Sequence, residues 1–271
     1  GGGCSKDGNY YAGNRYLPPQ EPSIGLLFDQ RGTLAGFQAI YDVENLALGS
    51  NHTYCNTLKR YKNYYDYLKQ PMINIETFGD RPKFVLTAYF YPPTKICSSI
   101  RDPNLVHERG FGKNIYFQNG PTPEELVTAP RTRSEAAAKN WDNNQCLPLN
   151  GYHNFKDSAH WDEKNCSENV PNWLFYDENR RLSGFGFSLP GCDPSPRFQH
   201  PPGFIVQYVS GSSCARRIAD TVKFSNINVY LVPVKDTLDD CLIDVFGMRF
   251  RIERICNLAG PLASFCQLIF H

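Results

Sequence analysis

"LLFDQRGTLAGF", residues 26–37, and "LFYDENRRLSGF", residues 174–185, are two versions of one phrase. In each, an aspartate begins a turn between two apolar runs, and a glycine lies inside the second run. An aspartate at the first turn position and a glycine at the fourth suit a type I turn between strands. Each phrase therefore predicts a β-hairpin. The glycines inside the second strands, Gly36 and Gly184, predict a bulge or a close approach of another backbone segment.

The similarity between the two halves of the chain extends over four blocks in the same order. The hairpin residues Leu26, Asp29, Leu34, Gly36 and Phe37 recur 148 positions later. Before the hairpin, Cys4 and Tyr10 match Cys146 and Tyr152. After it, Lys83 and Phe84 match Lys223 and Phe224, and Phe111 matches Phe246. A single hairpin phrase could recur by chance, but four collinear blocks favour a duplication. The sequence predicts two tandem β-rich units, residues 4–145 with a helical linker near 121–145, and residues 146–271.

Alternating residues and proline stops predict a mainly β fold with minor α structure. In the second unit, Ser225, Ile227 and Val229 share one face of a strand, and Asn226 and Asn228 share the other. The two homologous sheets could each have a core or could share one.

Three segments predict helices. Residues 57–71 form an amphipathic stripe that ends at Pro71. Thr122 and Pro123 suit the cap and first position of a helix over 122–127, and a further turn or two is expected in 134–141.

The charge of the chain gives no indication of a polyanionic partner. It has 271 residues, with 28 Lys+Arg against 27 Asp+Glu, so its formal net charge is +1. A nearly neutral protein has no global field that would attract nucleic acid or an anionic membrane. No apolar run approaches the roughly 18 residues of a spanning helix. We therefore expect neither a nucleic-acid partner nor a membrane span.

The cysteines indicate a disulfide-stabilised protein of an oxidising compartment. Their number is even, they are dispersed along the chain, and no pair has the C-x-x-C spacing of a zinc or redox motif. All ten are expected in disulfides: Cys4, Cys55, Cys97, Cys146, Cys166, Cys192, Cys214, Cys241, Cys256 and Cys266.

Two N-glycosylation sequons, at Asn51 and Asn165, agree with secretion. The first residues do not have the pattern of a signal peptide. The sequence therefore predicts an extracellular glycoprotein whose signal peptide has been removed.

The stretch from 141 to 173 differs most between the two units, because it contains all three tryptophans and two of the six histidines. Tyr152, Trp161 and Trp173 are candidates for stacking on a ligand. Three histidines and one carboxylate are candidates for acid/base catalysis, and the histidines could instead bind Zn or Cu: His153, His160, His200 and Asp157. The alternative is that the tryptophans belong to the core and the histidines are ordinary surface groups.

Three functions remain open from the sequence. The first is binding of a small-molecule or carbohydrate ligand in an aromatic and histidine-lined cleft between the two repeats. The second is a secreted hydrolytic or oxidative enzyme that uses the histidines as acid/base groups or metal ligands. The third is a structural, matrix or egg-type interaction protein without catalysis. The common nucleophile, phosphate and metal motifs are absent, so the sequence identifies no cofactor.

Overall fold

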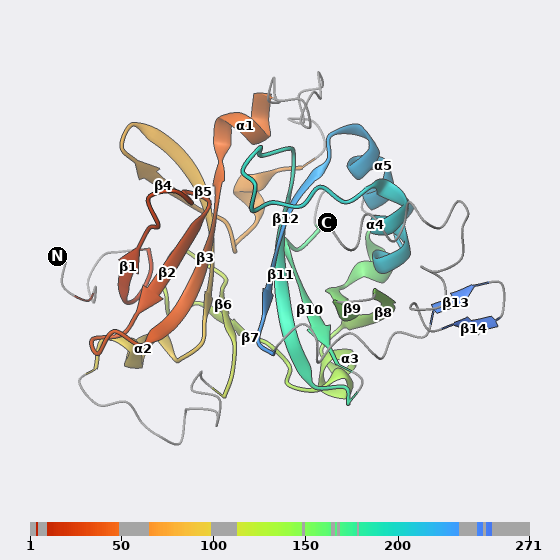
Figure 1. Ribbon diagram of the computed structural model, residues 1–271, viewed down its shortest axis with the longest axis horizontal. Coiled ribbons are helices and arrows are strands. Elements are labelled where there is room, and N and C mark those ends of the chain that lie inside the picture. Colours follow the sequence, from red (N-terminus) through yellow and green to blue (C-terminus); the bar gives the residue numbers. More distant parts are fainter. Residues whose placement is uncertain are drawn as a thin grey trace.

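The protein is mainly β, with two antiparallel sheets of similar size and a few short helices (Figure 1). The structure is a computed structural model. It describes residues 4, 10–48, 65–98, 113–147, 150–163, 166, 169–177, 179–232, 243–245 and 248–250.

The first sheet has seven strands in the order β1-β2-β3-β5-β6-β7, and β4 also pairs with β5. Its strands are β1 (Asn14–Tyr16), β2 (Ile24–Phe28), β3 (Leu34–Asp42), β4 (Asn74–Phe78), β5 (Arg81–Tyr89), β6 (Tyr116–Gln118) and β7 (Leu126–Thr128).

The second sheet has the order β12-β11-β10-β9-β8. Its strands are β8 (Trp141–Leu147), β9 (Gly151–Lys156), β10 (Asn172–Tyr176), β11 (Leu182–Pro190) and β12 (Phe224–Tyr230). A separate hairpin consists of β13 (Ile243–Val245) and β14 (Met248–Phe250).

The helices are short and come between strands along the chain. They are α1 (Val43–Leu48), α2 (Pro93–Ile96), α3 (Arg133–Ala138), α4 (Gly203–Ser210) and α5 (Ser213–Thr221), with single 3₁₀ turns at Tyr67–Lys69 and Ser158–His160.

The two predicted hairpins have the same strand register. Leu26 faces Phe37 in the first, and Leu174 faces Phe185 in the second, at equivalent positions. Each hairpin has one irregularity, between Leu27 and Phe28 in the first and at the corresponding place in the second. The repeated phrase thus encodes the same local structure twice, as predicted.

The turns of the two hairpins also have the same hydrogen bonds. The carboxylate of Asp29 accepts from the backbone N–H of Thr33, and the carboxylate of Asp177 accepts from that of Arg181. Gly32, with φ 76°, and Arg180, with φ 60°, occupy the same left-handed position. The aspartates therefore fix the turns, because they satisfy backbone donors that the strands leave unpaired.

Strand β5 of the first sheet corresponds to strand β12 of the second. The residues that match differ by one position from those that the sequence predicted. Gly36 faces Tyr89 in the first sheet, and Gly184 faces Tyr230 in the second. The sequence alignment had instead matched Phe84 with Phe224. Because side chains alternate along a strand, that one-residue slip reverses the face assigned to every side chain.

The first block of the predicted repeat, which matched Cys4 and Tyr10 with Cys146 and Tyr152, is wrong. Cys4 is disulfide-bonded to Cys97, whereas Cys146 lies in β8, which has no counterpart among the described strands of the first sheet. Tyr152 faces Tyr176 as Asn14 faces Phe28, so Asn14 and not Tyr10 is its counterpart. Phe111 and Phe246, on which the last block depends, lie outside the described residues. The structural repeat therefore consists of β1-β2-β3-β5 and β9-β10-β11-β12.

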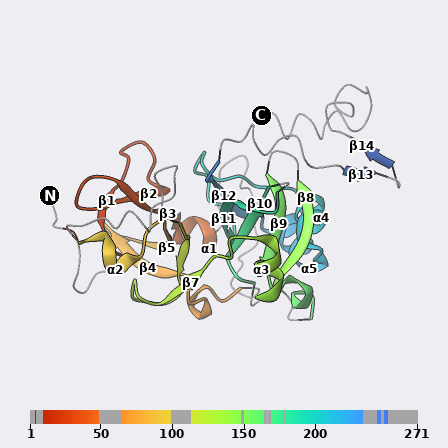
Figure 2. The ribbon, with the colours of Figure 1, turned by 90° about the horizontal axis from the view of Figure 1, so that it is seen from below.

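The two sheets pack against each other around one hydrophobic core, so the shared-core alternative is the correct one. The ring of Phe117 contacts Phe185 and Phe187 of the second sheet edge-on, with centroids 5.3 and 5.8 Å apart. Tyr41 of the first sheet stacks on Phe198 at 4.4 Å. Figure 2 shows the two sheets side by side, with α4 and α5 on the side of the second sheet away from the first.

Two of the helix predictions can be compared with the structure. The helix expected over 122–127 is wrong: Glu125 N–H bonds to the carbonyl of Thr122 in a turn, and Leu126–Thr128 then pairs with β6 as a strand. Tertiary pairing here overrides local helix propensity. The turns expected in 134–141 are confirmed as α3, where Thr132 and Glu135 form a capping box. Of the helix expected over 57–71, residues 57–64 lie outside the described residues, and Tyr67–Lys69 is a 3₁₀ turn.

Disulfides stabilise the fold, as expected from the sequence. Cys4 bonds to Cys97 and Cys166 bonds to Cys214, and Cys146 and Cys192 are also disulfide-bonded. None of the described cysteines is free. The remaining cysteines and the two sequons lie outside the described residues: Cys55, Cys241, Cys256, Cys266, Asn51 and Asn165. Within the described part of the chain, no helix has the length and apolar character needed to cross a membrane.

Candidate ligand-binding site

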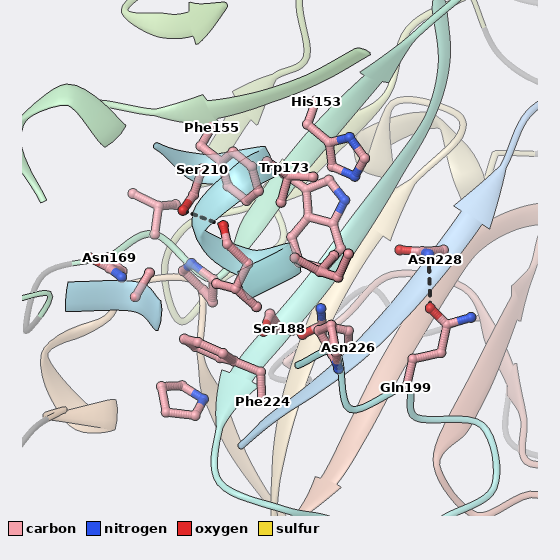
Figure 3. Close-up of a pocket in the computed structure, with 18 of the residues that line it drawn as sticks. His153, Phe155, Asn169, Trp173, Ser188, Gln199, Ser210, Phe224, Asn226 and Asn228 are labelled. Carbon is pink, nitrogen blue, oxygen red and sulfur yellow. Dashed lines mark hydrogen bonds between the residues drawn. The ribbon is translucent and has the colours of Figure 1, made fainter. Parts of the chain in front are cut away.

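A partly enclosed cavity of about 100 Å³ lies between the second sheet and the helices that cover its outer face (Figure 3). Its apolar walls include Phe155, Trp161, Trp173, Val206, Val209 and Phe224. The cleft was expected between the two repeats. The inner faces of the sheets are instead filled by the shared core, and this cavity lies on the opposite face of the second sheet.

Strand alternation brings the cavity side chains to one face of the sheet. Phe155 faces Trp173 on the neighbouring strand, Trp173 faces Gly186, and Gly186 faces Asn228. Directly paired residues of antiparallel strands share a face. The asparagine face that the sequence indicated on β12 is therefore the wall of the cavity, and the Ile227 face packs into the core.

Gly186 makes room for the indole of Trp173. A Cβ atom built on Gly186 would lie 2.2 Å from the Trp173 ring, far inside van der Waals contact. The glycine thus lets the indole lie across β11, close to the sheet. In the first sheet the equivalent pair is reversed, since Gln38 occupies the position of Gly186 and Gly25 that of Trp173.

The outer face of the first sheet, where the structure describes it, has no equivalent arrangement of apolar walls at these positions. Several residues equivalent to those around the cavity are polar there, and their side chains bind one another. Gln38 donates to Thr87, and Arg15, at the position equivalent to His153, forms an ion pair with Glu76 at 2.6 Å. The two units therefore have the same backbone plan but different outer faces. That the specific site belongs to the second unit stays a prediction.

Helices α4 and α5 form the outer wall. Val206 and Val209 of α4 point into the cavity, and Gly211, with φ 73°, ends this helix. Ser212 caps the start of helix α5, where its hydroxyl accepts from Ala215 N–H at 3.1 Å. The disulfide between Cys166 and Cys214 ties α5 to the loop that follows Trp161. Sequence reasoning missed both helices.

Polar groups form a cluster on one side of the cavity, which we name the amide cluster: Gln199, Asn226 and Asn228. Gln199 exchanges two backbone hydrogen bonds with Asn226, at 2.8 and 2.9 Å. The side-chain amide of Asn228 donates to the Gln199 side-chain oxygen at 3.3 Å, and Ser188 donates to Asn226 (Figure 3).

Three buried polar atoms of cavity-lining residues have no hydrogen-bond partner within the described structure. They are Oδ1 of Asn228, Oδ1 of Asn169 and Nε1 of Trp173. Leaving such a group unpaired costs about 1–3 kcal/mol, so native proteins usually satisfy it. These atoms are available to a bound molecule.

The cavity wall has no charged side chain among the described residues, because none of those that line it is Asp, Glu, Lys or Arg. His153 is its one histidine, and it is 4 % exposed. Burial lowers the pKa of His153 to about 3, although a hydrogen bond between Nδ1 and the Gly151 carbonyl opposes the shift. The imidazole is therefore neutral at physiological pH.

Of the predicted aromatic contacts, Trp161 and Trp173 line the cavity and Tyr152 does not. Trp161 donates from Nε1 to the Lys156 carbonyl at 3.2 Å, which fixes its ring. Tyr152 is next to His153 in β9 and so points to the opposite face, where the Arg133 guanidinium lies 4.2 Å from its ring centre.

The structure does not bring the candidate histidines together. His160 is exposed, with Nδ1 3.1 Å from a carboxylate oxygen of Glu163. His200 binds the Phe224 carbonyl through Nδ1 at 2.7 Å. Asp157 is 4.0 Å from the Lys156 ammonium and is not among the residues that line the cavity. His153 alone of these four candidates lines it.

One group of three candidate metal ligands was found among the described residues. It consists of Asp162, Cys166 and Cys214. The two cysteines form a disulfide, and Asp162 accepts hydrogen bonds from the backbone of Ser213 and Cys214. These atoms are therefore occupied in a helix cap, and the group does not fit a metal site.

Comparisons of the chain with protein-family models, with curated proteins and with solved structures gave no match.

Proposed function

We propose that this protein binds a small molecule in the cavity between the second sheet and helices α4 and α5. The observation that supports the proposal is a partly enclosed, mostly apolar cavity with a polar cluster on one side. Ligand sites commonly combine apolar walls with a few placed polar groups. Tyr65 of the first unit closes part of the cavity, where its hydroxyl donates to the Asn169 carbonyl at 2.9 Å.

The walls favour a small, largely apolar molecule over a carbohydrate. A sugar presents hydroxyl groups on most sides, and each needs a partner when it is buried. Here the polar side chains gather mainly at the amide cluster, while Trp173, Phe155 and Phe224 offer apolar surface.

The same walls support binding and not acid/base catalysis. A general acid or base must be within hydrogen-bond reach of the substrate, with a pKa near the working pH. The described lining contains no carboxylate, and the pKa of His153 is lowered to about 3 by burial.

We also propose that the protein is secreted and glycosylated. Three observations support secretion: two disulfides between described cysteines, two further bonded cysteines, and the two sequons. Disulfides persist in oxidising compartments and are rare in the cytosol.

The binding proposal can be tested with benzyl alcohol as a probe and the fluorescence of Trp161 and Trp173 as the readout. Both tryptophans line the cavity, so a bound molecule should change their emission in a saturable way. Val206→Trp, which fills the cavity, should abolish the saturable change. Phe204→Ala is the matched control, because Phe204 lies on the same helix and is 49 % exposed.

The expected result is saturable binding by the unmodified protein and by the Phe204→Ala variant, with loss of binding in the Val206→Trp variant. Circular dichroism and the melting temperature show whether each variant is folded. Equal binding by a folded Val206→Trp variant would show that the probe binds elsewhere, and the proposal would then be wrong.

A further inference from the structure

We propose that the ligand of the cavity is an uncharged molecule, about as large as a substituted benzene ring, with one hydroxyl or carboxamide group directed at the amide cluster. This inference rests on the proposed binding function and specifies the class of ligand. It follows from the charges around the cavity, the helix ends beside it, the unpaired polar atoms and the free volume.

The cavity offers no counter-charge to an ionic ligand. None of the described residues that line it is acidic or basic, and burial keeps His153 neutral. Moving an ionised group from water into such surroundings without a partner costs several kcal/mol. A carboxylate or an ammonium group buried in the cavity should therefore bind more weakly than an uncharged group.

The helix ends beside the cavity do not compensate for a negative charge. The first N–H of α4, on Gly203, donates to a carboxylate oxygen of Asp220 at 3.2 Å. The first N–H groups of α5 donate to Asp162, at 3.1 Å from Ser213 and 2.9 Å from Cys214. Helix N-termini can bind anions, but here carboxylates of the protein already occupy both ends.

The amide cluster provides a defined place for one uncharged polar group. Backbone hydrogen bonds hold Gln199 against Asn226, and Gln199 is exposed, so the cluster lies at the open side of the cavity. The unpaired Oδ1 atom of Asn228 can accept a hydrogen bond, and the unpaired Nε1 atom of Trp173 can donate one. A hydroxyl or a carboxamide both donates and accepts, so it could satisfy both atoms without bringing a charge into the cavity.

The free volume limits the apolar part of the ligand. The cavity measures about 100 Å³, and an apolar protein cavity of about 150 Å³ accommodates benzene. The enclosed space is about two thirds of that volume, so it holds at most one ring or a short alkyl chain, and a polar substituent must extend to the open side of the cavity. A long lipid chain or an oligosaccharide exceeds it.

A matched series of five probes tests the inference: benzyl alcohol, benzamide, toluene, benzoate and benzylammonium, each titrated at pH 7 by calorimetry or tryptophan fluorescence. We expect benzyl alcohol and benzamide to bind most tightly. Toluene, which lacks the polar group, should bind several-fold more weakly, and the two ions at least tenfold more weakly.

The Asn228→Leu variant tests the position of the polar group. Without the acceptor, the preference for benzyl alcohol, measured as the dissociation constant of toluene divided by that of benzyl alcohol, should fall to about one. Asn228 is at the edge of the sheet and only partly buried, so the variant should fold. Gln30→Leu, an exposed change in the first hairpin, is the control and should leave the preference unchanged.

The outcomes separate this inference from the binding function. If benzoate or benzylammonium binds as tightly as benzyl alcohol, and Val206→Trp abolishes that binding, the binding function stands and the uncharged ligand is wrong. An unchanged alcohol preference in Asn228→Leu contradicts the assigned position. If none of the five probes binds, both proposals fail.

Discussion

At the scale of single residues, His153 is the group whose surroundings most affect its chemistry. Its ring is buried in β9, perpendicular to Phe175 with centroids 4.8 Å apart, and its Nδ1 atom is 3.2 Å from the Gly151 carbonyl oxygen. Burial lowers its pKa from 6.5 to about 3, because the charged form would lose its hydration. His153 therefore contributes to the cavity wall as a neutral group.

The lowered pKa of His153 predicts loss of stability in acid. Below about pH 6.5 the unfolded chain binds a proton at this residue and the folded protein does not, so protons favour unfolding until about pH 3. The slope can reach about 1.4 kcal/mol per pH unit. His153→Leu should reduce the slope measured by denaturant unfolding between pH 6.5 and 4.

The control for this prediction is Phe204→Ala, which changes an exposed, uncharged side chain and should leave the slope as it is. Identical slopes for the His153→Leu variant and the unmodified protein would mean that His153 can be protonated in the folded state.

Gly186 supports a second prediction at the residue scale. In Gly186→Ala the new methyl group would lie 2.2 Å from the Trp173 ring, so the indole must move into the cavity. Overpacking of this kind destabilises proteins by about 1–3 kcal/mol. The melting temperature and the tryptophan emission should both change, and binding of benzyl alcohol should weaken.

Gly25→Ala is the matched control, because Gly25 belongs to the equivalent strand pair of the first sheet. Its Cβ would be 3.0 Å from the side-chain oxygen of Gln38, a milder contact far from the cavity. If both variants affect the tryptophan emission equally, the proposed role of Gly186 is wrong.

At the scale of secondary structure, the two hairpin turns share one conformation but not one residue type. Gly32 and Arg180 both have positive φ. A residue with a side chain costs about 1–2 kcal/mol in this left-handed conformation, whereas glycine adopts it readily. Arg180→Gly should therefore raise the free energy of unfolding, by about 0.5–1 kcal/mol after the greater flexibility of the unfolded chain is included.

Gly32→Ala should lower the free energy of unfolding by a similar amount, since it introduces the same strain into the first turn. The two variants thus act in opposite directions, which chemical denaturation can measure. Changes of the same sign would contradict the equivalence of the two turns.

The elements differ in how well local sequence predicts them. The hairpins were predictable because Asp29 and Asp177 fix their turns through nearby backbone groups. The exact match between β5 and β12 was not predictable. The two strands come from distant parts of the chain, and a shift of one residue leaves the apolar composition of the matched segments unchanged. The strand at Leu126–Thr128 depends on pairing with β6, which no local signal shows.

The two helices of the cavity had signals that could have been recognised. Ser212 precedes a run in which Cys214, Ala215, Ile218 and Ala219 are the buried residues of α5, a helical spacing. Gly211 marks the end of α4. Both helices are short, about two turns each, so their apolar pattern is brief compared with the windows that identify helices reliably.

The cavity could be predicted only in part. Trp161, Trp173 and His153 come from the stretch that differs most between the units, and they do line it. Gln199 and Val206 come from segments whose position depends on how α4 packs on the sheet. The histidine cluster was expected from residue type alone, without information on which faces His160 and His200 occupy.

At the scale of the whole molecule, one core joins the two units. Phe117 of the first sheet lies fully buried against Phe185 and Phe187 of the second. Truncation of a buried phenylalanine costs about 3–5 kcal/mol. Phe117→Ala should therefore destabilise both units together and not the first unit alone.

Two probes of unfolding can check this prediction. All three tryptophans lie between residues 141 and 173, in or beside the second sheet, so their emission reports on that sheet, and hydrogen exchange of β3 and β5 reports on the first sheet. A single shared transition, shifted equally by Phe117→Ala, is expected. Two separate transitions would contradict the shared core.

The most direct test of the proposed ligand site is a crystal structure of the protein with benzyl alcohol, at a concentration that saturates binding in solution. We expect the ring between Trp173, Phe224 and helix α4, with its hydroxyl within hydrogen-bond distance of Asn228 or Gln199. An empty cavity at saturation, or a ligand bound elsewhere on the protein, would contradict the proposed site.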